Sequence, residues 1–255
     1  MGALGSIMNS ITYLSAAGAI AIAATLAPGA SRADDEVASA ASSSACFDQG
    51  LYAKGAVVDY DTKISGDSPA PVYRTVNTGK GTAKFEGKTA NAVESETFDS
   101  KGKSEGVVTG YYDFAPGFLL ILGTEAKDFK SVFDPAGRQP IDQEKGDRYK
   151  QKYKMITTAK DVGTQTVDRQ AVWKFAGTES LKTKLGKFTV CKITAKFTDK
   201  IAPGFSTVTN LTTYVAASGK YRGFTLRTKT SGKAPTGQPI NITADVVKVR
   251  KFQPK

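Results

Sequence analysis

The sequence predicts an all-β fold, a single antiparallel sheet with little helix. Two observations predict it. From Leu51 onward, short segments rich in Val, Thr, Tyr and Phe alternate with clusters of turn residues. Several of these segments also alternate in polarity, as between Phe188 and Phe197, where Cys191 and Ile193 share one face and Lys192 lies on the other. Such a sheet has one packed face and one solvent face.

The first segment predicts an export signal over residues 1–33. Residues 11–30 contain no charged side chain, and Ser31-Arg32-Ala33 places small residues where a signal peptidase cleaves. The apolar part is short for a membrane span and no second apolar stretch follows, so we expect no transmembrane segment. No Lys or Arg precedes Arg32, which departs from the usual basic start of such signals. We expect a periplasmic or secreted protein.

Residues 34–50 are rich in Ala, Ser and acids and predict a flexible lead-in, followed by a single β-rich domain over 51–255. The only two cysteines of the chain are Cys46 and Cys191. In an exported chain they predict one disulfide. A lipid-modified Cys46 is the alternative, but Ser43-Ser44-Ala45 lacks the Leu-type residue that such a site needs.

The segments between turn clusters give the expected strands in order: 51–60, 71–77, 82–88, 92–98, 105–114, 118–123, 147–158, 165–175, 187–198, 205–216, 221–230 and 241–252. Only residues 124–131 have a helical pattern. The alternation disappears over 111–122, where both faces are apolar. This run is either a strand buried on both sides or the wall of an apolar cavity lined by Phe118, Leu120 and Leu122.

The clearest local feature is a row of basic residues in one expected strand. Arg148, Lys150, Lys152 and Lys154 recur at period two, so they project from one strand face about 7 Å apart. The row predicts an anionic partner, such as phospholipid headgroups. A solvated face whose lysines discourage edge pairing is the alternative.

Composition excludes much catalytic chemistry. The 255 residues include no His, and 35 Lys and Arg against 24 Asp and Glu give a net charge of +11. Without His, most Ser/His/Asp and Cys/His catalysis and most zinc sites are excluded. We predict no catalytic residues, no metal site and no cofactor. Nucleic acid is not predicted as a partner, because export, the lack of an aromatic RNA-binding motif and the lack of a recognition helix argue against it.

Residues 177–229 resemble bacterial periplasmic proteins of the LolA/LolB type. The resemblance rests on Gly177-Thr178-Glu179, the stretch from Gly186 to Ile193, Thr212-Thr213-Tyr214, and the stretch from Gly219 to Phe224. It implies a sheet strongly curved into an open or half barrel, whose concave side accepts acyl chains. No functional residue carries over by motif.

These patterns lead to three hypotheses. The first is a non-enzymatic envelope protein that binds a lipid, a lipoprotein or another amphipathic anionic ligand, with the 111–122 run on the concave face and the basic row at the headgroup. The second is an assembly factor that binds another envelope protein by edge pairing. The third is a His-independent hydrolase, which would need two acids or a Ser/Lys pair with perturbed pKa values in a deep pocket.

Overall fold

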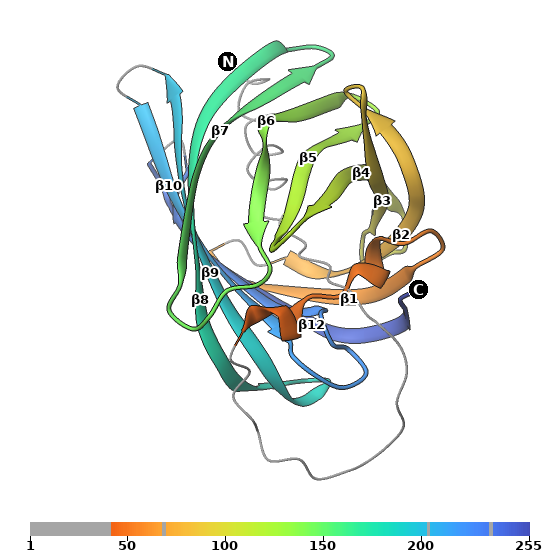
Figure 1. The fold of residues 1–255 in the computed structure, drawn as a ribbon. Helices are drawn as coiled ribbons and strands as arrows, with labels where there is room; N and C mark the ends of the chain where they lie inside the picture. Colours follow the sequence, from red (N-terminus) through yellow and green to blue (C-terminus); the bar gives the residue numbers. More distant parts are fainter. Residues whose placement is uncertain (1–41, 68–69, 203–204, 235–236) are drawn as a thin grey trace.

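The structure, a computed structural model, describes residues 42–67, 70–202, 205–234 and 237–255. Twelve antiparallel strands follow one another in sequence, and the last pairs with the first, so that the predicted sheet closes into a barrel (Figure 1). The strands are β1 Val57–Gly66, β2 Ala70–Phe85, β3 Lys88–Phe98, β4 Ser104–Ala115, β5 Phe118–Ala126, β6 Phe129–Pro140, β7 Arg148–Ala159, β8 Gly163–Thr183, β9 Gly186–Ala202, β10 Phe205–Ala216, β11 Thr225–Lys233 and β12 Pro239–Gln253.

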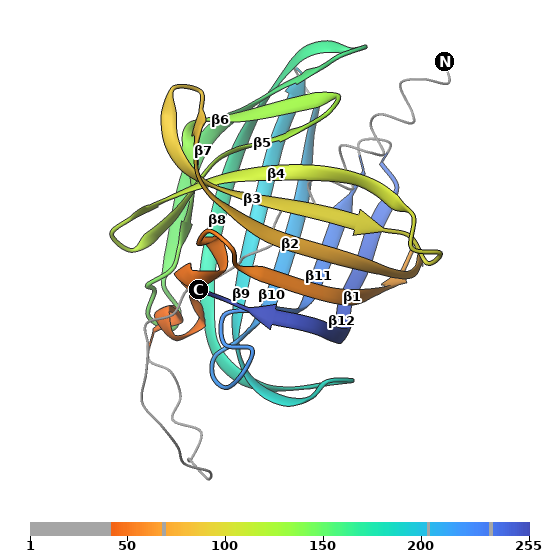
Figure 2. The same cartoon turned by 90° about the vertical axis from the view of Figure 1, so that its right-hand side faces the viewer.

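The barrel resembles two sheets that cross. β1 to β4 run side by side across one wall, whereas β8 to β10 run at a steep angle to them on the opposite wall (Figure 2). In the part of the chain that the structure describes, every strand has a partner on both sides. Such a barrel has no free sheet edge.

The predicted alternation in β9 is confirmed. Cys191, Ile193 and Ala195 are buried in one cluster, whereas Lys196 on the other face is exposed. The same cluster contains Trp173 of β8, which lies directly opposite Ala195 in the β8–β9 ladder. Side chains from neighbouring strands therefore form a continuous packed face inside the barrel.

Several ranges of the chain differ from the expectation. Residues 51–56, expected to begin the first strand, precede β1. Residues 124–131, predicted as helix, form the end of β5, a turn and the start of β6. Thr124 pairs with Ser131 and Glu125 with Lys130, so the segment has the period of a strand and not that of a helix. The expected break between the strands 71–77 and 82–88 lies inside β2, where a bulge between Gly79 and Gly81 lets one long strand continue.

The strand β6 is absent from the prediction because its centre, Asp134-Pro135-Ala136-Gly137, reads as a turn. Pro135 has no backbone N–H to donate. The pairing with β7 accordingly stops at Asp134, while the pairing with β5 continues to Pro140. Gln151 of β7 bridges this break, because its side chain donates to the carbonyl of Ala136 and accepts from the N–H of Arg138.

One end of the barrel is plugged by two short 3₁₀-helices, η1 (Ser43–Cys46) and η2 (Gln49–Tyr52). η1 lies within the predicted flexible lead-in over 34–50, and η2 extends two residues past its end. Residues 34–41 and the predicted export signal are outside the described range. Tyr52 is fully buried and packs edge-on against Tyr112 and Phe114 of β4. The predicted disulfide is present, because Cys46 is bonded to Cys191 of β9. The plug is thus attached covalently to the barrel wall.

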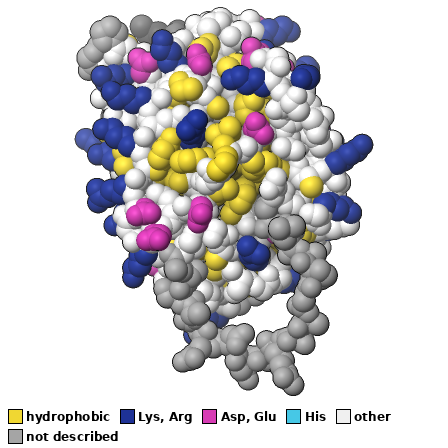
Figure 3. Space-filling view, viewed as in Figure 1, with side chains coloured by type: hydrophobic (Ala, Val, Ile, Leu, Met, Phe, Trp, Pro, Cys, Tyr) yellow, Lys and Arg dark blue, Asp and Glu magenta, His cyan; other side chains and the backbone are white. Residues whose placement is uncertain are grey.

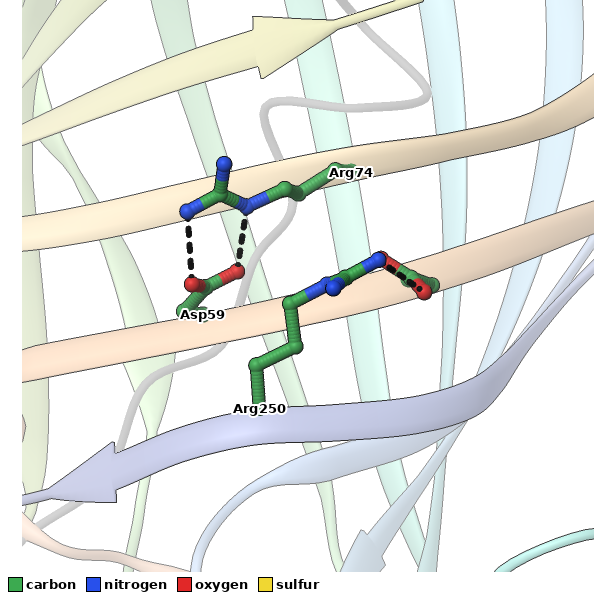
Figure 4. Close-up of polar contacts among 4 residues, drawn as sticks. Asp59, Arg74 and Arg250 are labelled. Carbon is green, nitrogen blue, oxygen red and sulfur yellow. Dashed lines mark hydrogen bonds and ion pairs between the residues drawn. The ribbon is translucent and has the colours of Figure 1, made fainter. Parts of the chain in front are cut away.

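Three ion pairs lie across or next to the β1–β12 seam where the barrel closes. Arg74 of β2 forms a two-pronged pair with Asp59 of β1, and Arg250 of β12 forms another with Asp61 of β1 (Figure 4). Further along the seam, Arg227 of β11 pairs with Asp245 of β12. Only the pair of Arg250 and Asp61 joins the last strand to the first, whereas the other two pairs join β1 to β2 and β11 to β12.

Candidate functional site

The predicted basic row lies on the solvent side of the barrel wall. Arg148, Lys150, Lys152 and Lys154 are exposed, whereas Tyr153 between them is buried in the interior cluster. The strand register adds cations from β8 and β9 on the same face. Lys174 of β8 lies directly opposite Arg148. Lys196 and Lys200 of β9 lie in the same cross-strand rows as Lys150 and Lys154, with Val172 and Asp168 of β8 between them. We call these seven side chains the basic face: Arg148, Lys150, Lys152, Lys154, Lys174, Lys196 and Lys200.

Figure 3 shows Lys and Arg side chains along the edge of the molecule where β7 to β10 lie. No residue of the basic face forms an ion pair within the described chain. Acids lie next to Lys154, which has Asp134 on one side and Asp168 on the other. The remaining cations have no acid directly opposite them, and two unit charges 6 Å apart in water repel by about 0.7 kcal/mol. An anionic partner would remove this cost.

The predicted apolar residues of β5 do not line the interior. Leu119 and Ile121 point into the large interior cluster, whereas Leu120 and Leu122 pack in a separate cluster with Phe85 from the β2–β3 hairpin. The ring of Phe118 is 4.8 Å from that of Tyr149, which packs against the interior cluster and so projects from the opposite face of β7 to Arg148. The run over 111–122 is therefore covered on both sides, by the interior on one face and by a hairpin on the other.

The interior itself is divided along the barrel axis, a property that the sequence pattern did not reveal. In β1, the inward residues Val58 and Tyr60 near the plug are buried, whereas Thr62 and Ile64 towards the opposite end are half-buried. β9 has the same gradient, from buried Cys191 to half-buried positions 197, 199 and 201. The inward side chains are therefore less buried in the half away from the plug, which we call the mouth.

A charged pair lies at the boundary of the two halves. Arg169 of β8 holds Asp199 of β9 by two hydrogen bonds of 2.6 Å, and their side chains are only 11% and 14% exposed. Burial opposes the charge of Arg169, but the bonds to Asp199 and the neighbouring Tyr153 outweigh it and raise the pKa of the guanidinium. Its cation also stands 4.9 Å from the centre of the Phe197 ring. The pair is internally neutralised, so it places no net charge in the interior.

Among the described residues no cluster of three or more Cys, Asp and Glu side chains could hold a metal ion. Glu94, one of two acids that share a face of β3, is paired with Lys80. No helix in the described ranges is long and apolar enough to cross a membrane.

Comparison with solved structures shows the fold. A protein of Bacteroides fragilis with a YmcC-like fold, proposed to be exported, superposes with a TM-score of 0.51 at 10% identity, over 78% of this chain and 96% of that one. A proposed lipoprotein of Parabacteroides distasonis gives 0.47 at 9% identity, over 78% and 98%. The hypothetical lipoprotein YmcC of Escherichia coli gives 0.41 at 11% identity, over 75% and 84%. No family model and no curated protein matches the sequence.

Proposed function

We propose that this chain is an exported protein of the bacterial envelope that binds an anionic amphipathic partner, a lipid or a lipoprotein, and catalyses no reaction. The observation that carries the proposal is the basic face. Seven cations stand in register on three adjacent strands, and Arg148 and Lys174 face each other directly across the β7–β8 ladder. Like charges in such positions destabilise a sheet, and binding of an anionic partner would relieve this repulsion.

Export is supported by the leader pattern and by the disulfide between Cys46 and Cys191, which persists in an oxidising compartment. The resemblance to LolA/LolB proteins and the fold shared with the Bacteroides fragilis protein agree with an envelope location. Edge pairing with another protein has less support, because the described strands leave no free edge to extend.

Binding to vesicles tests the proposal. We expect the purified chain to sediment with vesicles that contain phosphatidylglycerol and not with vesicles of phosphatidylcholine alone. Near an anionic surface each cation contributes about 1 kcal/mol, so the double variant Lys150→Gln, Lys152→Gln should bind about 30-fold more weakly.

The matched control is the double variant Lys101→Gln, Lys103→Gln. It removes the same charge from two exposed lysines at the same spacing, in the turn between β3 and β4. We expect its binding to be reduced less than threefold. Equal losses in the two double variants would mean that net charge alone attracts the vesicles, and the basic face would then have no specific role.

A further inference from the structure

The basic face ends on two exposed apolar side chains of β10. Val208 and Asn210 are exposed, whereas Leu211, on the other side of the strand, is buried in the interior cluster. Val208 therefore projects from the outer side of the barrel wall, as the basic face does. It is 36% exposed, and Phe205, at the start of the same strand, is 40% exposed. We call Phe205 and Val208 the apolar margin.

The strand register places the apolar margin beside lysines of the basic face. Val208 lies directly opposite Thr198 of β9, and Lys196 and Lys200 stand two residues to either side of Thr198. Because side chains alternate along a strand, both of these exposed lysines project from the same face as Val208. Neighbouring strands lie about 5 Å apart, so the ammonium groups and the apolar side chains form one continuous surface.

Two comparably exposed valines elsewhere in the described chain have different surroundings. Val72 of β2 and Val107 of β4 are each 39% exposed. They belong to the wall opposite β9 and β10 (Figure 2). Val107 has the acid Glu96 directly opposite it in the β3–β4 ladder, where an anionic surface would be repelled. The apolar margin differs from these valines because it adjoins cations.

Exposed apolar side chains next to lysines are typical of protein surfaces that lie on an anionic membrane. The apolar groups enter the boundary between headgroups and acyl chains, and the ammonium groups stay at the phosphates. Long lysine side chains allow this, because their flexible stems reach from the sheet back to the headgroups. The outer side of a closed barrel is convex, so a single lipid bound there would leave its acyl chains in water. A bilayer keeps those chains covered.

We infer that the basic face docks this chain on the surface of an anionic bilayer, with the apolar margin inserted below the headgroups. The inference rests on the proposed function and narrows its partner from an anionic amphipath to a lipid membrane. It also sets an orientation, in which the wall of β7 to β10 faces the lipid and the wall of β1 to β4 faces away from it.

Sedimentation with vesicles of phosphatidylglycerol and phosphatidylcholine measures what the apolar margin contributes. The double variant Phe205→Ser, Val208→Ser keeps every charge of the basic face. Since about two-fifths of each side chain is exposed and available for burial, we expect it to bind roughly 20-fold more weakly. The matched control Val72→Ser, Val107→Ser removes two comparably exposed side chains from the opposite wall and should change binding less than about twofold.

Tryptophan fluorescence reports insertion without removing an apolar group. The single tryptophan of the chain, Trp173, is 7% exposed in the interior, so the unmodified chain serves as the blank. Phe205→Trp should be quenched by vesicles whose phosphatidylglycerol carries bromine on its acyl chains. Val107→Trp, at a comparably exposed position of the opposite wall, should give no more quenching than the blank.

The outcomes separate this inference from the proposed function. If the unmodified chain does not sediment with anionic vesicles, the proposed function is refuted and the inference falls with it. If the chain sediments but the double serine variant binds equally well, or Phe205→Trp is not quenched, the inference alone is overturned and the contact is purely electrostatic. Competition by dihexanoyl phosphatidylglycerol below its micelle concentration would also overturn it, because a single lipid would then be the partner.

Discussion

The disulfide between Cys46 and Cys191 should be the largest single contribution to stability that can be removed without changing the sequence. It joins residues 145 positions apart. In the chain-entropy model, opening a loop of this length raises the conformational entropy of the unfolded chain by about 17 cal/mol/K, which lowers the free energy of unfolding by about 5 kcal/mol at 25 °C. For a domain of this size, 1 kcal/mol corresponds to about 2–4 °C in melting temperature. Reduction should therefore lower the melting temperature by about 10–20 °C.

The comparison uses the same chain in two redox states, because both sulfur atoms then remain in the core. Cys46 is 4% exposed and Cys191 is fully buried, so the bond has to be reduced in denaturant before refolding. Urea unfolding, followed by circular dichroism, gives the free energy of unfolding for the oxidised and the reduced protein. Ser43→Ala is a control, since it keeps the disulfide and removes only the hydrogen bond between Ser43 and the N–H of Gln143. It should cost about 1 kcal/mol.

A difference of less than about 1 kcal/mol between the two redox states would refute this reasoning. It would mean that the unfolded chain already holds the two cysteines close together, or that the native bond is strained by as much as the loop entropy gains. A change in the urea dependence, with little change in midpoint, would favour the first explanation.

Three other predictions concern the interior and the plug. Arg169→Met leaves the carboxylate of Asp199 without its partner and should cost about 3–5 kcal/mol in urea unfolding, whereas Arg169→Met combined with Asp199→Leu should recover most of that loss. Burial raises the pKa of both Tyr60 and Tyr112 to about 12, so the stability that each neutral phenol contributes is fully present below pH 10 and is lost as the pH rises through 12, by about 3 kcal/mol for each; the double Phe variant should abolish that loss in unfolding measured against pH. Gly79→Ala should loosen the plug, because its Cβ would stand 1.9 Å from the carbonyl oxygen of Ala53, and hydrogen exchange over residues 42–56 should increase; unchanged exchange would argue against a close contact there.

The sheet was predictable because local rules determine it. Turn residues at short intervals and the period-two pattern of β9 reflect burial on one side and solvent on the other, which a single strand already encodes. The errors arose where pairing overrides a local signal. The glycines at 79 and 81 permit a bulge as well as a turn, and Pro135 is tolerated in β6 because only one of its two neighbouring ladders continues past it.

The basic row was predictable for the same reason, since its spacing alone places four cations on one side of a strand. The cations of β8 and β9 that complete the basic face depend on register between strands, which the sequence does not specify. The burial of Leu122 beneath the β2–β3 hairpin is a tertiary property as well.

The closure of the barrel also sets an order of events in synthesis. β1 begins at Val57 and pairs with β12, which ends at Gln253. The β1–β12 ladder can therefore form only after nearly the whole chain has been synthesised. Until then β1 has an open edge, which can pair with another chain. Contacts between residues so distant in sequence also slow folding. A chain that lacks its last 15 residues should therefore aggregate during production, and in the cell this step would favour a chaperone that shields β1 until the C-terminus arrives.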